Sequence, residues 1–432
     1  MKYSFYPDPA IWSDLFKRTG VDISAKMEIV RSVIERVRKD GDMAVLELTR
    51  EFDGADLHEI RMDVKAKTSE LTTTSITPSL QEAVETAIQN IRTFHRAQWP
   101  TEPRLETTKG VECRQLWRPL ERVGLYIPGG TAPLVSSLMM LAIPALVAGC
   151  KELVVATPPR KDGSVDPIIL YVANRLGIPN LYLMGGAQAI AAMTCGTESV
   201  PKVDKLFGPG NQYVTLAKQL AQLEGTPIDM PAGPSEVLII ADETANPAFV
   251  AADLLSQAEH GIDSQVILVT VDETLVPQVE QEIERQLKTL SRKVTALKAL
   301  EESHVIVLKT LNEAVSFSNG YAPEHLILAV SDPEPFVEKI THAGSIFLGH
   351  LTPESMGDYA SGTNHTLPTN GYARNYSGVS LTSFMKSITV QKASEEGIKS
   401  LGPAVELLAE AEGLDAHKQA VRVRLESLAT VK

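Results

Sequence analysis

Gln257 and His260 lie three positions apart near the end of a predicted helix. This spacing puts both side chains on one face of the helix, so the pair can share a metal ion. Glutamine is an uncommon zinc ligand, however, since zinc sites are built mainly from cysteine, histidine and carboxylates. The spacing alone therefore favours a solvated helix end over a metal site.

A second pair, Glu324 and His325, places a carboxyl group beside an imidazole just before an apolar stretch. Such neighbours suit proton transfer near pH 7, although a surface pair of this kind is usually inert. Asp358 and His365 frame a loop of small polar residues that packing does not explain, and here a functional interpretation is favoured. His417, in a helical tail, carries no signal by itself. The other histidines support no functional interpretation: His58, His95, His304, His342 and His350.

Gly or Pro pairs follow four predicted strands, at residues 128–130, 158–159, 185–186 and 208–210. In parallel sheets these joints lie at the carboxyl edge, where open α/β folds bind ligands and where small residues let backbone N–H groups approach phosphate. The run Gly208-Pro209-Gly210 has no third glycine and does not complete a GxGxxG motif. A tight turn explains each glycine equally well, but four joints in succession favour a nucleotide site, centred on Gly129-Gly130, Gly185-Gly186 and Gly208-Pro209-Gly210.

The segments that carry these residues alternate between short apolar strands and helices. Strands are predicted at residues 123–127, 153–156, 181–184 and 205–207, and then at 237–241, 265–270, 304–308, 326–330 and 345–348. Repeated strand–turn–helix units indicate parallel strands with crossover helices on both faces. Amphipathic helices are expected around residues 29–37 and 80–91, a hairpin near 111–117, and a helical tail over 395–432. The sequence therefore predicts an α/β protein with two α/β units, and the polar stretch 349–380 is expected to be functional.

Length, charge and cysteine content narrow the class. A chain of 432 residues is expected to form two main domains, and a net charge of −13 argues against a nucleic-acid partner. Three scattered cysteines fit a reducing cytosol, and the first residues show no export signal, so a cytoplasmic protein is expected. The longest apolar stretch, residues 134–150, is short and interrupted, which predicts a buried helix rather than a membrane span.

Six blocks of the sequence resemble the histidinol dehydrogenase family, in the order in which that family has them. They are residues 124–130 (GLYIPGG), 207–211 (FGPGN), 229–236 (DMPAGPSE), 253–260 (DLLSQAEH), 323–325 (PEH) and 357–365 (GDYASGTNH). The similarity runs from Gly41-Asp42 and Phe52-Asp53-Gly54 to His417-Lys418, which is nearly the whole chain. Six ordered blocks are not expected by chance.

The resemblance implies a role for particular residues. It implies one Zn²⁺ per subunit, held by Gln257, His260, Asp358 and His417. It implies that Glu324 and His325 are the acid–base pair. It implies that the substrate is held by this metal set together with His325, Ser235, His365 and Glu412. It implies contacts to NAD from Tyr126, Gln188 and Asn211.

The chemistry implied by the resemblance is a four-electron oxidation, the last step of histidine biosynthesis. L-Histidinol gives L-histidinaldehyde and then L-histidine, with two NAD reduced. His325 would take the alcohol proton, and Glu324 would activate water for the second oxidation. The family is a homodimer whose C-terminal segment crosses to the partner, so His417 would serve the neighbouring site.

With the resemblance, the fold expectation becomes two Rossmann-like parallel-sheet domains with small helical N- and C-terminal extensions. We expect an N-terminal extension at residues 1–24, and a first α/β domain from residues 25–105 and 236–380 that carries most of the metal and substrate site. Residues 106–235 are expected to form the NAD-binding domain. Residues 381–432 are expected to be a helical segment swapped to the partner.

Two other functions fit part of the pattern. A zinc hydrolase of the amidase kind would use His, Asp and Glu around a metal, with Glu324 activating water. The glycine-marked strand ends disfavour it, because a hydrolase needs no dinucleotide site. A non-catalytic regulatory protein on an α/β scaffold is the second alternative, and the presence of every candidate ligand disfavours it.

Overall fold

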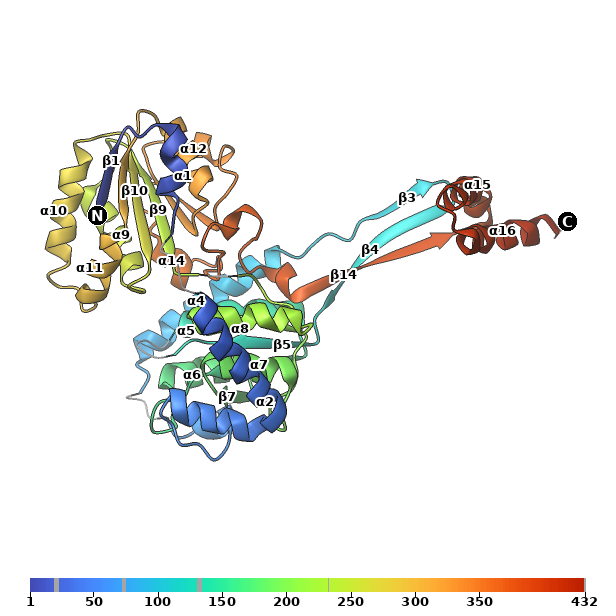
Figure 1. Ribbon diagram of the computed structural model, residues 1–432, viewed down its shortest axis with the longest axis horizontal. Coiled ribbons are helices and arrows are strands. Elements are labelled where there is room, and N and C mark those ends of the chain that lie inside the picture. Colours follow the sequence, from blue (N-terminus) through green and yellow to red (C-terminus); the bar gives the residue numbers. More distant parts are fainter. Residues whose placement is uncertain (19–22, 72–74, 130–133, 232, 431–432) are drawn as a thin grey trace.

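The computed structural model describes residues 1–18, 23–71, 75–129, 134–231 and 233–430. These residues form two α/β units, each built on its own sheet, and an arm that projects away from both (Figure 1). The mixed α/β architecture with parallel strands confirms the predicted fold class. No helix in the described ranges is long and apolar enough to cross a membrane.

The first unit contains a six-stranded sheet in the order β1-β11-β10-β9-β12-β13, in which every neighbouring pair is parallel. Its strands are β1 (Lys2–Phe5), β9 (Glu236–Ala241), β10 (Gln265–Thr270), β11 (His304–Val307), β12 (His325–Ala329) and β13 (Ser345–Leu348). One face is covered by α9 (Pro247–Ala258), α10 (Leu275–Gln286) and α11 (Lys293–Glu301), and the other by α1 (Trp12–Leu15) and α12 (Leu311–Tyr321). Because both faces are covered, β9 is buried throughout, as expected for a central parallel strand.

The second unit contains a five-stranded sheet in the order β2-β7-β6-β5-β8. Its strands are β2 (Arg61–Asp63), β5 (Arg122–Tyr126), β6 (Glu152–Thr157), β7 (Asn180–Leu183) and β8 (Lys205–Phe207), of which only β2 pairs antiparallel. One face packs against α4 (Pro78–Ala97), α5 (Val135–Ala148) and α6 (Pro167–Arg175), and the other against α2 (Ile23–Phe52), α7 (Gly186–Cys195) and α8 (Gln212–Leu223). The short helix α3 (Val64–Thr68) contacts α6.

Three of the expected domain boundaries are wrong. Residues 106–235 were expected to form one domain, but residues 106–108 and 111–119 belong to the separate sheet of the arm. Residues 25–105 were expected to join residues 236–380, but α2 and α4 pack on the five-stranded sheet instead. The N-terminal segment is not a separate extension, because β1 pairs with β11 at the edge of the six-stranded sheet. The last two differences arise because an apolar helix face or strand shows that a segment is buried without showing against which sheet.

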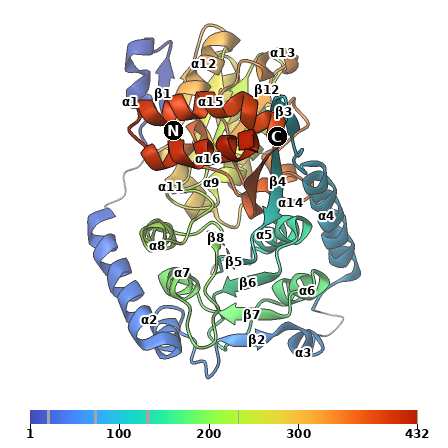
Figure 2. The same cartoon turned by 90° about the vertical axis from the view of Figure 1, so that its right-hand side faces the viewer.

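The arm is a three-stranded antiparallel sheet, in the order β14-β4-β3, that carries two helices at its far end (Figures 1 and 2). Its elements are β3 (Arg104–Thr108), β4 (Val111–Pro119), β14 (Met385–Ala393), α15 (Glu395–Ala411) and α16 (Asp415–Thr430). The predicted hairpin near residues 111–117 is confirmed as β3 and β4. The expectation that residues 381–432 are helical is wrong for their first part, because a 3₁₀ turn, η3 (Leu381–Phe384), and β14 precede the helices.

Three helices begin with the same pattern, a polar capping residue followed by proline. Thr77, Asp166 and Asn246 each accept a backbone N–H bond at the start of a helix, and each is followed by proline at the first helical position. A polar cap satisfies an otherwise unpaired N–H group, and proline there loses no helical bond. These caps fix where α4, α6 and α9 start. The C-terminal end of α9 carries Gln257.

The remaining short elements are η1 (Pro9–Ile11), α13 (Glu334–Val337), α14 (Glu354–Tyr359) and η2 (Tyr372–Arg374). The last two lie within the polar stretch 349–380, which is therefore not a continuous loop. Each sheet also has a point where the strand order reverses, between β5 and β8 in one unit and between β9 and β12 in the other. In open α/β sheets, ligands bind at such points.

Candidate active site

A cavity of about 790 Å³ lies between the two units. From the five-stranded unit it is lined by Pro128 and the turn 208–211, which follow β5 and β8 at the carboxyl edge. From the six-stranded unit it is lined by Ser235, Glu236 and Glu324, which lie at the amino ends of β9 and β12. The glycine joints were expected to mark a carboxyl edge, and the joint at 208–210 does. Ser235, Glu236 and Glu324 instead lie at the amino edge of the six-stranded sheet.

Glu324 and His325 are placed by the turn between α12 and β12. The helix ends at Tyr321, the next residue, Ala322, reverses the chain with a φ of 57°, and the pair follows Pro323 directly. Both side chains are buried, in contrast to the inert surface pair that the sequence left open. The backbone N–H of Glu236 donates to Glu324 Oε2 at 2.8 Å, and His325 Nδ1 donates to the Glu236 carbonyl at 3.2 Å. One residue of the neighbouring strand thus holds both members of the pair.

His325 Nε2 is buried without a hydrogen-bond partner and lies 3.4 Å from Asp358 Oδ1, which is also buried and unsatisfied among the described residues. Burial alone would lower the pKa of His325, but the charges of Glu324 and Asp358 hold it well above the ordinary value. Burial raises the pKa of Glu324. Burial acts to raise the pKa of Asp358, but His325, together with His365 and His260, lowers it below the ordinary value.

The three implied metal ligands of the body approach the same place from two helices. Gln257 lies at the end of α9 with His260 just beyond it, and Asp358 lies on α14. His260 lines the cavity. Burial lowers its pKa and the Asp358 carboxylate acts to raise it, while His260 in turn acts to lower the pKa of Asp358. With its amide oriented to satisfy both ends, Gln257 donates from Nε2 to Glu354 Oε1 at 3.0 Å. Burial raises the pKa of Glu354 to about 8.

Gln257, His260 and Asp358 are suited to bind a divalent metal, but within one chain they leave its coordination incomplete. Asp358 Oδ1 is an unpaired buried oxygen, and His260 faces the cavity, which suits a cation. Within the described ranges, however, no three His, Cys, Asp or Glu side chains are grouped so that they could hold a metal. The fourth implied ligand, His417, lies on α16, at the end of the arm (Figure 1). Of the four implied ligands, a single chain therefore places His260 at the cavity, and Gln257 and Asp358 lie in the same unit without lining it.

The implied substrate residues are also divided between the cavity and the arm. Ser235 and His365 line the cavity, and burial lowers the pKa of His365. Glu412 and His417 lie in the helical part of the arm, whose two helices pack on each other and on β3 and β14. The structure therefore does not bring Glu412 or His417 to the cavity of their own chain.

The implied NAD contacts surround the strand ends of the five-stranded unit. Asn211 lines the cavity and caps α8, accepting from Tyr213 N at 3.0 Å. Tyr126 and Gln188 are buried beside the turn at 185–186, where the Tyr126 hydroxyl accepts from Gly186 N at 3.1 Å. Gln188 Nε2 donates to Asp53 Oδ2 at 3.2 Å. Neither Tyr126 nor Gln188 lines the cavity. Gly130, part of the first predicted joint, lies outside the described residues.

Gly208, in the turn at 208–210, is held by a buried ion pair. Its N–H donates to Asp229 Oδ2 at 2.8 Å, its carbonyl accepts from Lys218 Nζ at 2.8 Å, and Lys218 Nζ lies 2.5 Å from Asp229 Oδ1. Gly208 has a φ of 128°, and a Cβ there would strike the Tyr126 carbonyl, so only glycine fits. The ion pair and the glycine together fix the shape of this wall of the cavity.

Several of these residues were not predicted from the sequence. Glu354 could have been found, because it lies four positions before Asp358 and so shares a helix face with it. Lys218 offered a weaker signal, as a charge on an otherwise apolar helix face. Arg18 and Glu236, which pair at the cavity, offered none, because they are far apart in the chain.

Comparison with known proteins tests what kind of enzyme this is. A family model described as histidinol dehydrogenase matches residues 16–425. The chain belongs to the histidinol dehydrogenase family. It is 52% identical over 428 residues to a histidinol dehydrogenase of Bacteroides fragilis, an alignment that covers 99% of this chain and 100% of the relative. It is 53% identical over 417 residues to the chloroplastic histidinol dehydrogenase of Arabidopsis thaliana, covering 96% and 89% of the two chains.

A solved structure gives the same answer. The crystal structure of histidinol dehydrogenase from Elizabethkingia anophelis superposes with a TM-score of 0.95 at 52% identity, covering 100% of this chain and 99% of that one. Membership in the histidinol dehydrogenase family confirms the predicted resemblance and identifies the chain as an oxidoreductase enzyme of histidine biosynthesis. The hydrolase and the non-catalytic alternatives therefore lose their support.

Proposed function

We propose that the chain oxidises L-histidinol to L-histidine through L-histidinaldehyde, with zinc and two molecules of NAD. The observation that carries the proposal is the buried Glu324–His325 pair. The free imidazole nitrogen of His325 lies 3.4 Å from Asp358 Oδ1, and Glu324 lines the cavity that the glycine turn at 208–210 also lines. In the first oxidation the alcohol loses a proton and a hydride. The aldehyde then adds water, and the hydrate loses a second proton and hydride.

His325 is the base of the proposed reaction. A carbonyl oxygen only accepts hydrogen bonds, so the contact with the Glu236 carbonyl keeps the proton on Nδ1 and leaves the Nε2 lone pair free in the neutral ring. That nitrogen is buried without a partner, where it can take the hydroxyl proton of the substrate as hydride leaves. Burial disfavours the charged ring, but the Glu324 and Asp358 carboxylates raise the pKa of His325 and so stabilise the imidazolium that forms when it takes this proton.

Glu324 is the residue proposed to activate water for the second oxidation. It lines the cavity, and only one of its carboxyl oxygens is held by the Glu236 N–H group. Burial raises its pKa toward the range in which a carboxylate can accept a proton from water at neutral pH. Two neighbouring residues would thus serve two proton transfers in one cavity, which keeps the reactive aldehyde from escaping.

Two molecules of NAD, bound one after the other, would each accept one hydride, and we place the NAD contacts at Tyr126, Gln188 and Asn211. The turn at 208–211 supports this placement, because small residues at a carboxyl edge and the start of α8 suit a pyrophosphate. The switch between β5 and β8 falls at the same place. Tyr126 and Gln188 would act from beneath the neighbouring turn.

Zinc would be held by Gln257, His260 and Asp358 of one chain and His417 of a second chain, and when bound it would fix the substrate by its nitrogens. The proposed homodimer follows from the arm. Glu412, just after α15, and His417, on α16, are implied substrate and metal residues, yet these two helices pack mainly on each other and on strands of the arm. A partner whose arm reaches this cavity would complete both sets.

NADH absorbance tests the proposal. Protein given L-histidinol and NAD should form two NADH per histidinol, and other amino alcohols should be oxidised more slowly. Chelation should abolish the activity and added Zn²⁺ should restore it, whereas a His58→Asn control at an exposed site should behave as the wild type. No NADH from histidinol would refute the proposed reaction. Full activity of metal-free protein would refute the zinc requirement alone.

A further inference from the structure

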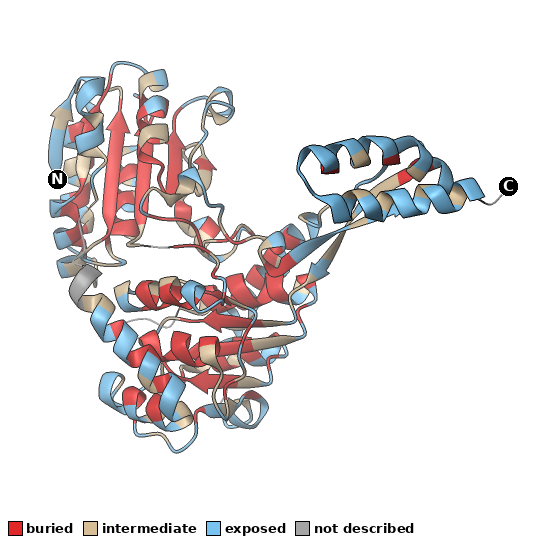
Figure 3. Ribbon diagram, turned by 45° about the vertical axis from the view of Figure 1, so that its right-hand side comes forward, coloured by how far each residue is buried: buried red, intermediate tan, exposed pale blue. Residues whose placement is uncertain are grey.

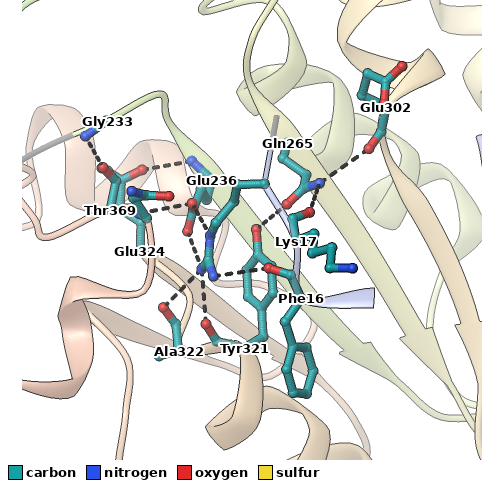
Figure 4. Close-up of polar contacts among 12 residues, drawn as sticks. Phe16, Lys17, Gly233, Glu236, Gln265, Glu302, Tyr321, Ala322, Glu324 and Thr369 are labelled. Carbon is teal, nitrogen blue, oxygen red and sulfur yellow. Dashed lines mark hydrogen bonds and ion pairs between the residues drawn. The ribbon is translucent and has the colours of Figure 1, made fainter. Parts of the chain in front are cut away.

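Glu236, whose backbone bonds both Glu324 and His325, forms a buried ion pair with Arg18, a residue near the N-terminus. Figure 4 shows the polar contacts around Glu236 and Tyr321, between the start of β9 and the end of α12. We propose that Arg18 is a positioning residue for catalysis, and that its ion pair with Glu236 holds the backbone that aligns Glu324 and His325. The inference rests on the proposed function only in taking these two residues as the acid–base pair.

Arg18 and Glu236 form a largely buried two-point contact at the wall of the cavity. Arg18 Nε donates to Glu236 Oε1 at 2.7 Å and Nη2 donates to Oε2 at 3.0 Å, while the side chains are 17% and 3% exposed. The N–H of Asn370 also donates to Glu236 Oε1, at 2.9 Å. Such a fork fixes the position of the carboxylate in two directions. Glu236 therefore has little freedom to move.

The main chain of the same glutamate carries the alignment. Its N–H group donates to Glu324 Oε2 and its carbonyl accepts from His325 Nδ1. The side chain of Glu236 is thus fixed by Arg18, and its backbone fixes both members of the acid–base pair. A shift of Glu236 would move both hydrogen bonds at once.

Arg18 also holds the segment that delivers the pair. Its Nη2 donates to the Tyr321 carbonyl at 2.9 Å, and the guanidinium lies 3.9 Å from the centre of the Tyr321 ring. Tyr321 is fully buried, and its hydroxyl donates to Gln265 Oε1 at 2.7 Å. The next residue, Ala322, has the positive φ that turns the chain toward Glu324. Arg18 therefore joins the start of β9 to the turn before β12.

Stability alone does not account for this arrangement. A buried ion pair is often no more stabilising than apolar residues of the same volume, because both charges lose their hydration. What apolar residues would not supply is a fork that ties two backbone segments together. Since a displacement of about 1 Å can cost ~10²-fold in rate, holding these segments has direct value for catalysis.

The test is Arg18→Met, assayed with histidinol beside Arg18→Lys. We expect kcat to fall about 10- to 100-fold in Arg18→Met, with KM for NAD and bound zinc unchanged. Arg18→Lys should recover part of the loss, because it restores one charge but no fork. With histidinol deuterated at the carbinol carbon, the isotope effect on kcat should increase in Arg18→Met. Arg36→Met, which removes an exposed ion pair with Glu47, should match the wild type.

A double variant, Arg18→Met with Glu236→Leu, separates alignment from folding. It removes both charges together, so thermal stability should return toward that of the wild type while kcat stays low. Recovery of kcat together with stability would overturn the inference, as would unchanged kcat in Arg18→Met or a loss confined to KM for NAD. His325→Asn, run in parallel, tells the two proposals apart: if it stays active, the acid–base assignment fails, and if only Arg18→Met stays active, the positioning role fails.

Discussion

The imidazole of His325 shows how burial gives an ordinary residue an unusual environment. One ring nitrogen is held by a backbone carbonyl, and the other is buried without a partner beside Asp358. The sequence showed that an acid and an imidazole are neighbours. It did not show that they are buried, because burial depends on β9, which lies nearly ninety residues earlier. The adjacency was predictable, and the environment was not.

The different contacts of Glu324 and His325 predict different losses on substitution. His325→Asn should lower kcat on both histidinol and histidinaldehyde, by roughly 10²–10⁴-fold for loss of a general base. Glu324→Gln keeps the side-chain shape but cannot accept a proton, so it should impair aldehyde oxidation more than alcohol oxidation. Steady-state rates with each substrate check this, and equal losses on both substrates in Glu324→Gln would contradict the division of labour.

Asp253 allows a prediction about pH and stability. Burial raises its pKa from 3.8 to about 7, so the folded state favours the neutral acid. Its stabilising contribution is complete below pH 3.8 and is lost as the pH rises through about 7. Asp253→Asn stays neutral, so in metal-free protein its free energy of unfolding relative to wild type should increase by roughly 1–3 kcal/mol between pH 5 and pH 8.

Urea unfolding at the two pH values measures this difference. Asp40→Asn, at an exposed position, is the matched control and should show no pH-dependent gain. If Asp253→Asn tracks the wild type at both pH values, the carboxyl group is not desolvated in the way its surroundings indicate.

At the scale of elements, the strands were the most predictable part of the fold. All five strands predicted after residue 236 are present within about one residue of their expected bounds, because buried parallel strands are continuous apolar runs. The partners of α2 and α4 were not predictable, since an amphipathic pattern identifies a buried face but not the surface that covers it. The same holds for Arg18 and Glu236, whose contact leaves no local pattern.

The strand pattern also did not predict where the polar residues of the site lie. The rule for open α/β sheets directs attention to carboxyl edges, and it succeeds for the turn at 208–211. Glu236 and His325, by contrast, lie at the amino ends of β9 and β12. The resemblance to a family supplied His325 but gave no role to Glu236, whereas the strand pattern supplied only the sheet.

Loss of the Lys218–Asp229 ion pair, which holds the backbone of Gly208, is predicted to weaken NAD binding. Asp229→Asn should weaken the hold on both the turn and Lys218, because one buried charge is left without its partner. KM for NAD should increase about tenfold or more, which corresponds to ~1.4 kcal/mol, with a smaller effect on zinc content. Lys39→Met, at an exposed site, is the control. A loss of thermal stability with unchanged KM for NAD would show that the pair only stabilises the fold.

At the scale of the whole molecule, the arm has too little to pack against within one chain. Figure 3 shows that exposed residues dominate it, in contrast to the buried sheets of the body. Leu401, Val405 and Leu408 of α15 are apolar and exposed, Leu408 at 67%. Apolar residues on a projecting arm are typical of a surface covered by another chain.

The proposed sharing of the active site predicts that two inactive chains can complement each other. His417→Ala removes a ligand carried by the arm, and His325→Asn removes the base carried by the body, so each homodimer should be inactive. In a mixed dimer, the body of the first chain keeps His325 and receives an intact His417 from the second, which makes one of the two sites whole. If His417 instead served its own chain, each site of the mixed dimer would carry one lesion. Subunits should be mixed under mild denaturation, the mixed dimers verified by two affinity tags, and NADH formation from histidinol measured. Verified mixed dimers without activity would show that the site is not shared in this way.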